Sequence, residues 1–242
     1  MKPFGKVFSV QTSVILGSII IGLAILISGG VIKPQILKTG TNQAANLPAN
    51  NTPPVAQPTA APGAKVNVEA GHLPAKGNPA AKVSIIEFAD FQCPFCERFF
   101  SQVGQNIIKD YVDTGKAKFS FRHYAFLGQE STWAAEASEC ANEQGKFWEY
   151  HDYLYNHQGQ ENSGAFAKDK LEGFAQTLGL NTEQFKNCLE TDKYADKVKA
   201  DLADGQKAGV NGTPATFING QLISGAAPYA NFKIAIDGEL AK

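Results

Sequence analysis

Two cysteines placed where a buried strand gives way to a helix restrict the fold of this chain more than any other feature. Residues 83–88 form a short apolar run rich in β-branched side chains, which is typical of a buried strand. Apolar residues then recur at helical spacing over residues 97–111. Cys93 and Cys96 lie between the two patterns. We therefore expect both thiols in the first turn of a helix that follows the strand directly.

The rest of the pattern predicts an α/β domain. Residues 117–124 alternate aromatic and polar side chains, as a second strand would, and Asn219-Gly220 suits the two-residue turn of a hairpin. The two hairpin strands and a closing helix are expected at residues 215–218, 221–224 and 232–240. Between the second strand and the hairpin the pattern is helical, over residues 131–144, 146–156, 170–178, 182–189 and 194–208. The expected order is strand, helix, strand, helical insertion, hairpin and helix.

The spacing of Cys93 and Cys96 allows the two thiols to form a small disulfide ring. At a helix N-terminus, unpaired backbone N–H groups and the helix dipole stabilise an anion, so we expect a lowered pKa at Cys93, the attacking thiol. Pro94 suits the first helical turn because it has no N–H to leave unpaired. Cys96, one turn further into the helix, is expected to be the resolving thiol.

Three other interpretations of the pair remain open: half of a zinc site, a structural disulfide, and two inert reduced thiols. Zinc needs four ligands, and the sequence holds no second Cys-x-x-Cys. His123, His151 and His157 show no matching ligand spacing, and each is interpreted as a surface or packing residue. These observations favour a redox pair over a metal site.

The residues around the pair resemble the DsbA family of thioredoxin-fold oxidoreductases. The similarity runs from about residue 77 to the C-terminus, and it includes Cys-Pro-Phe-Cys at 93–96, Glu-Phe-Ala-Asp-Phe at 87–91 and Gly-Val-Asn-Gly-Thr-Pro-Ala-Thr-Phe at 209–217. The resemblance implies a thioredoxin-like α/β fold over residues 65–242, with a helical subdomain inserted at about 130–208. It also implies protein-disulfide oxidoreductase activity with no added cofactor, because the cysteine pair is itself the redox group.

The same resemblance suggests roles for residues outside the pair. In this family a cis-proline lies opposite the cysteines, and Pro214 stands at that position, although an ordinary trans turn is the alternative. Thr213 would offer its backbone to a substrate in extended form. Glu87 matches the buried acid beneath the disulfide, which takes the proton that Cys96 loses; a solvent-facing carboxylate is the alternative. Phe95 stands where the best-known oxidases of the family carry His, so we expect a less oxidising potential.

Cys140 and Cys188 form a second and more distant pair, on two helices of the predicted insertion. Some members of the family carry a disulfide in the helical domain, so the resemblance favours a bond between them. An exported location favours the bond as well. Two buried reduced thiols are the alternative.

Residues 1–34 are predicted to be an N-terminal membrane anchor or signal segment. No charged residue occurs from position 7 to 32, and a helix of about 20 apolar residues spans a bilayer. Lys2 and Lys6 favour a cytoplasmic N-terminus, which gives a single-pass membrane protein with its catalytic domain on the extracytoplasmic side. Cleavage near residues 28–30 would instead give a secreted or periplasmic protein. Residues 35–64, rich in Pro, Ala and Asn, are predicted to be a disordered linker.

These patterns together predict an extracytoplasmic oxidase that introduces disulfides into exported proteins with cysteine thiols. The resemblance implies a membrane quinone-linked thiol oxidase as the partner that reoxidises it. A disulfide reductase or isomerase, and a non-catalytic peptide-binding chaperone, are the alternatives. A glutathione-dependent enzyme usually lacks the second thiol, so Cys96 argues against that class. The formal net charge of -1 provides no basic field for nucleic acid.

Overall fold

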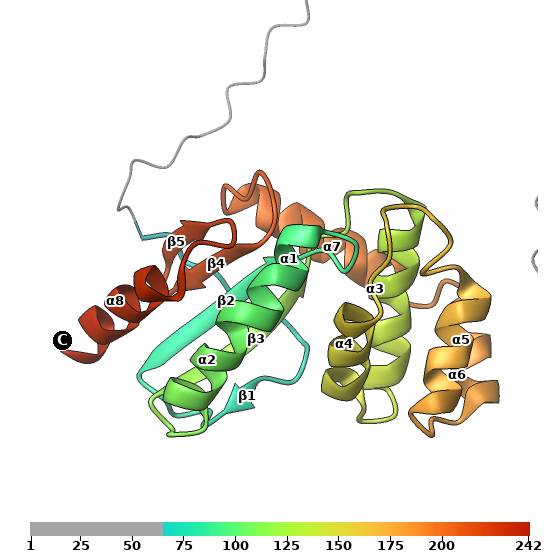
Figure 1. Ribbon diagram of the computed structural model, residues 1–242, viewed down its shortest axis with the longest axis horizontal. Helices are drawn as coiled ribbons and strands as arrows, with labels where there is room; N and C mark the ends of the chain where they lie inside the picture. The colour runs from blue at the N-terminus through green and yellow to red at the C-terminus, as the bar shows by residue number, and fades with distance from the viewer. Residues whose placement is uncertain (1–64) are drawn as a thin grey trace, which may run out of the picture. The chain divides into compact units, whose positions relative to one another are not determined.

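The computed structural model describes residues 65–242, which are built around a mixed β-sheet (Figure 1). The sheet has the order β1-β3-β2-β4-β5. Its strands are β1 (Lys76–Gly77), β2 (Val83–Ala89), β3 (Ala117–His123), β4 (Ala215–Ile218) and β5 (Gln221–Ser224). β2 pairs parallel with β3 and antiparallel with β4. Because parallel neighbours need a crossover connection, the chain leaves the end of β2 through the cysteine pair and returns by a helix.

A helical segment makes this crossover and covers one face of the sheet. It consists of α1 (Pro94–Phe99), η1 (Phe100–Gly104), α2 (Gln105–Ile107) and η2 (Ile108–Val112), in which both η parts are π-helical. α8 (Tyr229–Leu240) packs beside the segment, with the rings of Phe99 and Phe232 5.3 Å apart. Side chains from both helices join those of β2 and β3 in one apolar cluster. The helix that carries Cys96 is thus fixed against the sheet by its buried side.

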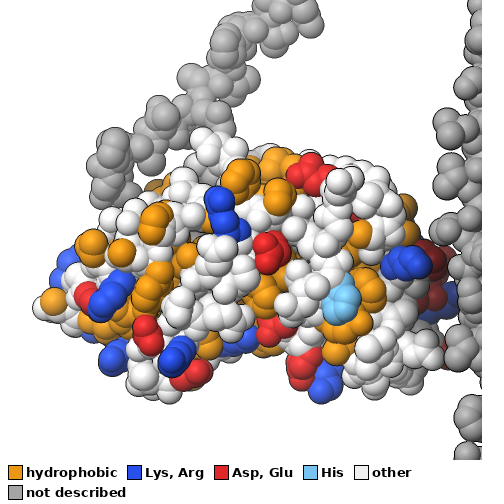
Figure 2. All heavy atoms as spheres, in the orientation of Figure 1, with side chains coloured by type: hydrophobic (Ala, Val, Ile, Leu, Met, Phe, Trp, Pro, Cys, Tyr) orange, Lys and Arg blue, Asp and Glu red, His pale blue; other side chains and the backbone are white. Residues whose placement is uncertain are grey.

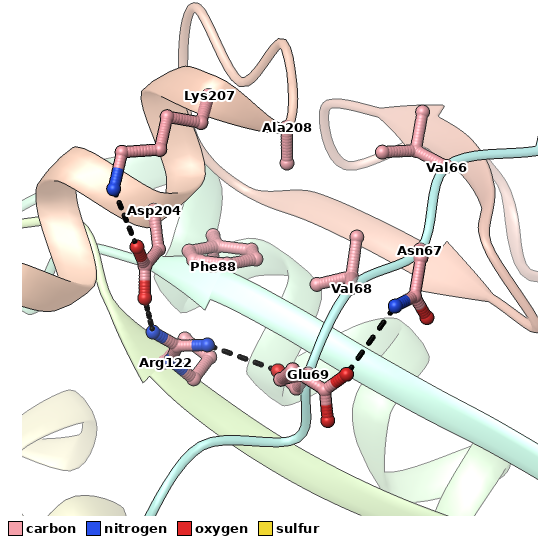
Figure 3. A pocket seen from close by; sticks show the side chains of 9 residues that line it. All are labelled: Val66, Asn67, Val68, Glu69, Phe88, Arg122, Asp204, Lys207 and Ala208. Carbon is pink, nitrogen blue, oxygen red and sulfur yellow. Dashed lines mark hydrogen bonds and ion pairs between the residues drawn. The ribbon is translucent and has the colours of Figure 1, made fainter.

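The opposite face of the sheet is covered by α7 (Ala195–Lys207) and by the extended segment at residues 65–70. Arg122, from β3, joins both to the sheet. Its guanidinium donates to the carbonyl oxygen of Glu69 and to the carboxylate of Asp204, each at 2.9 Å, beside the pocket in Figure 3. The ion pair fixes the end of β3, which lies next to the strand that leads to the cysteines.

The remaining helices form a subdomain between β3 and α7. They are α3 (Gln129–Asn142), α4 (Phe147–Asn156), α5 (Lys168–Thr177) and α6 (Thr182–Glu190), and they lie together at the end of the molecule away from α8 (Figure 1). Buried aromatic and aliphatic side chains fill their centre, among them Phe147, Tyr150, Leu154, Leu171 and Phe185. A disulfide between Cys140 and Cys188 joins α3 to α6.

The thioredoxin-like α/β order expected from the sequence is confirmed, with shifts at the ends of elements. The crossover helix begins at Pro94, directly after Cys93, as predicted, because proline suits a first helical turn. The closing helix begins at Tyr229 rather than at residue 232. The sequence gives no sign of β1, since two residues are too few to form a pattern. The predicted anchor at 1–34 and linker at 35–64 lie outside the described residues. None of the helices within residues 65–242 has the length and apolar character that crossing a bilayer requires.

The Cys140–Cys188 bond is expected to stabilise the folded domain. The two cysteines are 48 residues apart in the chain, so the bond restricts a long loop in the unfolded state. In the chain-entropy approximation this contributes about 4 kcal/mol to the free energy of unfolding. Urea denaturation of the wild type and of a Cys140→Ala/Cys188→Ala variant measures the difference. An unchanged unfolding midpoint would contradict the expectation.

Candidate active site

Cys93 and Cys96 lie at the junction of β2 and α1. Cys93 is the N-cap of α1 in extended conformation, and its carbonyl oxygen accepts hydrogen bonds from the N–H groups of Cys96 at 3.0 Å and Glu97 at 3.1 Å. Both thiols are free in this structure. Cys93 is 5% exposed, whereas Cys96 has no exposed surface. The outer sulfur is therefore the one that a substrate thiol can reach.

The loop before β4 faces the outer cysteine. The Thr213-Pro214 peptide bond is cis. The Sγ atom of Cys93 lies 3.5 Å from the carbonyl oxygen of Thr213, within hydrogen-bond distance for a thiol. The carbonyl of Pro214 accepts a hydrogen bond from the N–H of Gly225 at 2.7 Å, which ties the loop to the chain just after β5. Thr213, 120 residues from Cys93 in sequence, and Pro214 are thus brought to the cysteines by the sheet.

The two thiols differ strongly in pKa. The hydrogen bond from the Cys96 thiol is the largest influence on Cys93 and lowers its pKa to about 6; burial opposes this, and the side chain of Thr213 and the backbone N–H groups of Cys96 and Phe95 support it. Burial, followed by the hydrogen bond and the charge of Cys93, raises the pKa of Cys96 well above its ordinary value. At neutral pH the pair is therefore one thiolate and one thiol.

Glu87 is buried inside the fold, at 3% exposure, so the solvent-facing alternative does not apply. Burial first, and the charge of Cys93 second, raise the pKa of this carboxyl to about 8. Its Oε1 atom has no hydrogen-bond partner among the described residues. The carboxyl is therefore protonated at neutral pH and sensitive to the charge on Cys93.

Asp90 organises the loop between β2 and the cysteines. One carboxylate oxygen accepts hydrogen bonds from the N–H of Gln92 at 2.8 Å and from the hydroxyl of Ser131 at 2.7 Å. The other accepts from the N–H groups of Phe126 and Leu127 at 2.9 and 3.1 Å. A buried carboxylate with four donors holds the approach to the cysteines rigidly against the start of the helical subdomain.

The helical subdomain also holds the cysteine loop from the other side. The amide of Gln158 donates to the carbonyl oxygens of Phe91 at 2.7 Å and Cys93 at 3.1 Å.

Sequence reasoning did not find Asp90 or Gln158 as site residues. The sequence does hint at the role of Asp90, since an Asp after a strand often accepts a hydrogen bond from the backbone N–H two residues later and so forms a turn. Gln158 carries none, because its contacts are 65 residues away or more in the chain.

Of the three histidines considered from the sequence, two are buried and one is at the surface. His123 and His151 are buried, while His157 is exposed and stacks on Tyr153. Within residues 65–242, no group of three or more His, Cys, Asp or Glu side chains is arranged to hold a metal ion.

Comparison with known proteins gives a consistent result. The thioredoxin family model matches residues 69–238. The chain is 32% identical over 170 residues to disulfide bond formation protein D of Bacillus subtilis (strain 168), which covers 69% of this chain and 77% of that protein. The chain belongs to the DsbA-like thioredoxin family.

Solved structures of DsbA-like proteins agree with this assignment. Oxidised BdbD from Bacillus subtilis superposes with a TM-score of 0.67 at 32% identity, over 70% of this chain and 94% of that one. The α-DsbA1 protein of Wolbachia pipientis superposes with a TM-score of 0.63 at 26% identity, over 69% of this chain and 90% of that one. As a DsbA-like protein, the chain is a protein-disulfide oxidoreductase.

Phe95, the residue between Pro94 and Cys96, lies at the surface of the site. Its ring is 53% exposed beside the outer cysteine, and the guanidinium of Arg98 lies 4.9 Å from the ring centre. A phenylalanine side chain donates no hydrogen bond, so the side chains that lower the pKa of the Cys93 thiol are those of Cys96 and Thr213. The exposed ring adds apolar surface next to the reactive sulfur.

Replacing the buried acid is expected to stabilise the reduced protein, increasingly as pH rises. The pKa of Glu87 is raised from 4.5 to about 8 on folding, so the folded state holds a proton that the unfolded state releases between these values. Stability is therefore lost as pH rises from 4.5 toward 8, by an amount on the order of 4 kcal/mol. A Glu87→Gln variant carries no such penalty.

Urea denaturation under reducing conditions at pH 5 and pH 8 tests this expectation. The advantage of Glu87→Gln over the wild type should be small at the lower pH and should reach roughly 4 kcal/mol at the higher one. Glu183→Gln, at an exposed position on α6, is the matched control and should show no such trend. An advantage that does not grow with pH would show that Glu87 is ionised in the folded protein.

Proposed function

We propose that this DsbA-like protein is an extracytoplasmic oxidase that introduces disulfides into exported proteins, with Cys93 and Cys96 as its redox centre. The observation that carries the proposal is the unequal pKa of the two thiols, about 6 for Cys93 and well above the ordinary value for Cys96. A stabilised thiolate favours the reduced form of the enzyme. An enzyme whose reduced form is stabilised is a strong acceptor of electrons from substrate thiols.

The reaction begins with the enzyme pair oxidised. A substrate thiolate attacks the Sγ atom of Cys93, the bond between Cys93 and Cys96 breaks, and the sulfur of Cys96 leaves with the electron pair and takes up a proton. A second substrate thiolate then attacks the substrate sulfur of the mixed disulfide. The substrate leaves with its new disulfide, and Cys93 is released as a thiolate, a good leaving group because its pKa is low.

Glu87 is suited to supply and remove the proton of Cys96. Its carboxyl is protonated at neutral pH while Cys93 is a thiolate, because burial and that charge raise its pKa to about 8. When Cys93 is bonded to another sulfur its charge is gone, and the pKa of Glu87 falls by the part that this charge contributes, while burial still raises it. The ionised form of Glu87 then becomes easier to reach, and it can take the proton from Cys96, whose sulfur attacks Cys93.

Thr213 and Pro214 are proposed to hold the substrate beside the sulfur. The carbonyl oxygen of Thr213 lies 3.5 Å from Cys93 Sγ, so an extended substrate that pairs with this backbone brings its cysteine to the reactive atom. Phe95, next to Cys96, and Phe126, whose N–H donates to Asp90, are 53% and 48% exposed and offer apolar contacts. The face in Figure 2 carries acidic and basic side chains intermixed, which suits varied substrates better than a polyanion.

The proposal includes the location and the partners expected from the sequence. Residues 1–34 would anchor the protein in the membrane or direct its export, and residues 35–64 would link the anchor to the domain at 65–242. A membrane quinone-linked thiol oxidase would return the pair to its disulfide form.

The less oxidising potential expected from Phe95 stays a prediction. The same site run in reverse would make a reductase or isomerase, since direction depends on potential and partners.

Oxidation of a reduced peptide with two cysteines tests the proposed function. The oxidised wild-type protein should convert the peptide dithiol to a disulfide, one peptide for each Cys93–Cys96 disulfide consumed. Cys93→Ser and Cys96→Ser should both give no conversion, because neither variant can form the enzyme disulfide that oxidises the peptide. Equal conversion by the wild type and Cys93→Ser, measured by mass spectrometry, would support a non-catalytic peptide-binding role instead.

A further inference from the structure

The buried carboxyl of Glu87 must exchange protons with solvent in every redox cycle, although it has almost no exposed surface. A small cavity lies beside it. The cavity has a volume of about 20 Å³, room for one water molecule. Its lining includes Glu87, from β2, and His151 and Asp152, from α4. The cavity is therefore a route by which the buried carboxyl can reach the helical subdomain.

The two ring nitrogens of His151 are placed so that one can accept a proton while the other donates one. Its Nδ1 atom lies 2.8 Å from the carboxylate of Asp152, which can only accept, so the Nδ1–H donates and Nε2 is left as the proton acceptor. Nε2 is buried and has no partner among residues 65–242, like Oε1 of Glu87. Two unpartnered polar atoms, one basic and one acidic, thus belong to side chains that line one cavity.

The surroundings of His151 explain why it passes a proton rather than keeping one. Its ring packs against the rings of Phe91, Phe100, Phe121, Phe147, Trp148 and Tyr155. This burial lowers the pKa of the imidazole, and the hydrogen bond with Asp152 opposes the effect only in part. The neutral ring can accept a proton briefly, and Asp152 stabilises the cation while it lasts.

Several other titratable groups face His151. Lys76 of β1 lies 3.8 Å from the carboxylate of Asp152, and its charge, like that of His123 on β3, lowers the pKa of His151. Tyr155 of α4 packs on the ring, and the charged groups that act on Tyr155 are Cys96, Glu87, Asp90 and Cys93. The side chains of Asp152 and Lys76 are 38% and 28% exposed, so the far end of the route meets solvent.

We propose that His151 carries protons between Glu87 and solvent, with Asp152 as the exit. The inference rests on the proposed function and extends it. When Cys93 enters a mixed disulfide, Glu87 loses its proton across the cavity to Nε2 of His151, and the imidazolium releases its Nδ1 proton at Asp152. Glu87 then takes the proton of the Cys96 thiol, and the Cys96 sulfur attacks Cys93 and expels the bound thiolate. The opposite transfer reprotonates Cys96 when the enzyme disulfide opens.

A chromogenic nitroaryl disulfide separates the two sulfur reactions in the reduced full chain. In the first phase the Cys93 thiolate attacks the reagent and releases one coloured thiolate. In the second, Cys96 loses its proton, attacks the mixed disulfide and releases another. His151→Gln should leave the first rate unchanged and slow the second by about ten-fold near neutral pH, with its pH profile displaced, because only the second needs proton removal.

Asp152→Ala, at a part-exposed position, is the second variant and should slow the second phase in the same direction by a smaller factor. Glu149→Ala, on the same helix with its carboxylate paired to Lys146, is the matched control and should match the wild type. Unchanged second phases in His151→Gln and Asp152→Ala would overturn the inference. Equal slowing of both phases would also overturn it, since it would indicate a structural role.

The same experiment distinguishes a failure of the proposed function. If the wild type releases only one coloured thiolate, Cys96 does not resolve the mixed disulfide, and the oxidase mechanism itself fails. If the wild type releases two and the variants behave like it, only the role of His151 fails.

Discussion

The thiol of Cys96 donates a hydrogen bond to the sulfur of Cys93, and this is the largest single reason that the outer sulfur ionises near pH 6. The bond requires the two cysteines to lie one helical turn apart, with the inner one buried. Burial raises the pKa of Cys96, so its thiol keeps its proton and remains able to donate this hydrogen bond. The asymmetry of the pair thus follows from the way α1 starts just after the end of β2, the central strand of the sheet.

The rest of the fold fixes the position at which α1 begins. The apolar side of the crossover helix packs on β2 and β3 together with α8, which fixes the depth of Cys96. Asp90 and Gln158 fix the loop that leads into the helix, through the main chain of residues 91–93. The helical subdomain is therefore part of the active site and not an appendage, because α4 and the segment after it contribute contacts to the cysteine loop and to the cavity beside Glu87.

Sequence reasoning succeeds where the controlling interactions are local. The strand over β2, the helix after Pro94 and the turn at Asn219-Gly220 are determined by periodicity and by residues that prefer one conformation. It fails where a contact depends on packing of distant segments. The burial of Glu87 follows from the coverage of both faces of β2, by the crossover helix and α8 on one face and by α7 and residues 65–70 on the other, and the pattern within one strand does not reveal that coverage. His151 gives a partial signal, since it lies four residues from both Phe147 and Tyr155 on the apolar side of α4.

The ionisation of Cys93 in the reduced protein is the most direct test of this account. Thiolate absorbance in the ultraviolet, followed across a pH series, reports it without a substrate or partner. The account predicts one thiolate that appears with a pKa of about 6, and no second transition at Cys96 until well above the ordinary range for cysteine. A single transition at about 8.5, the value of an unperturbed thiol, would contradict it.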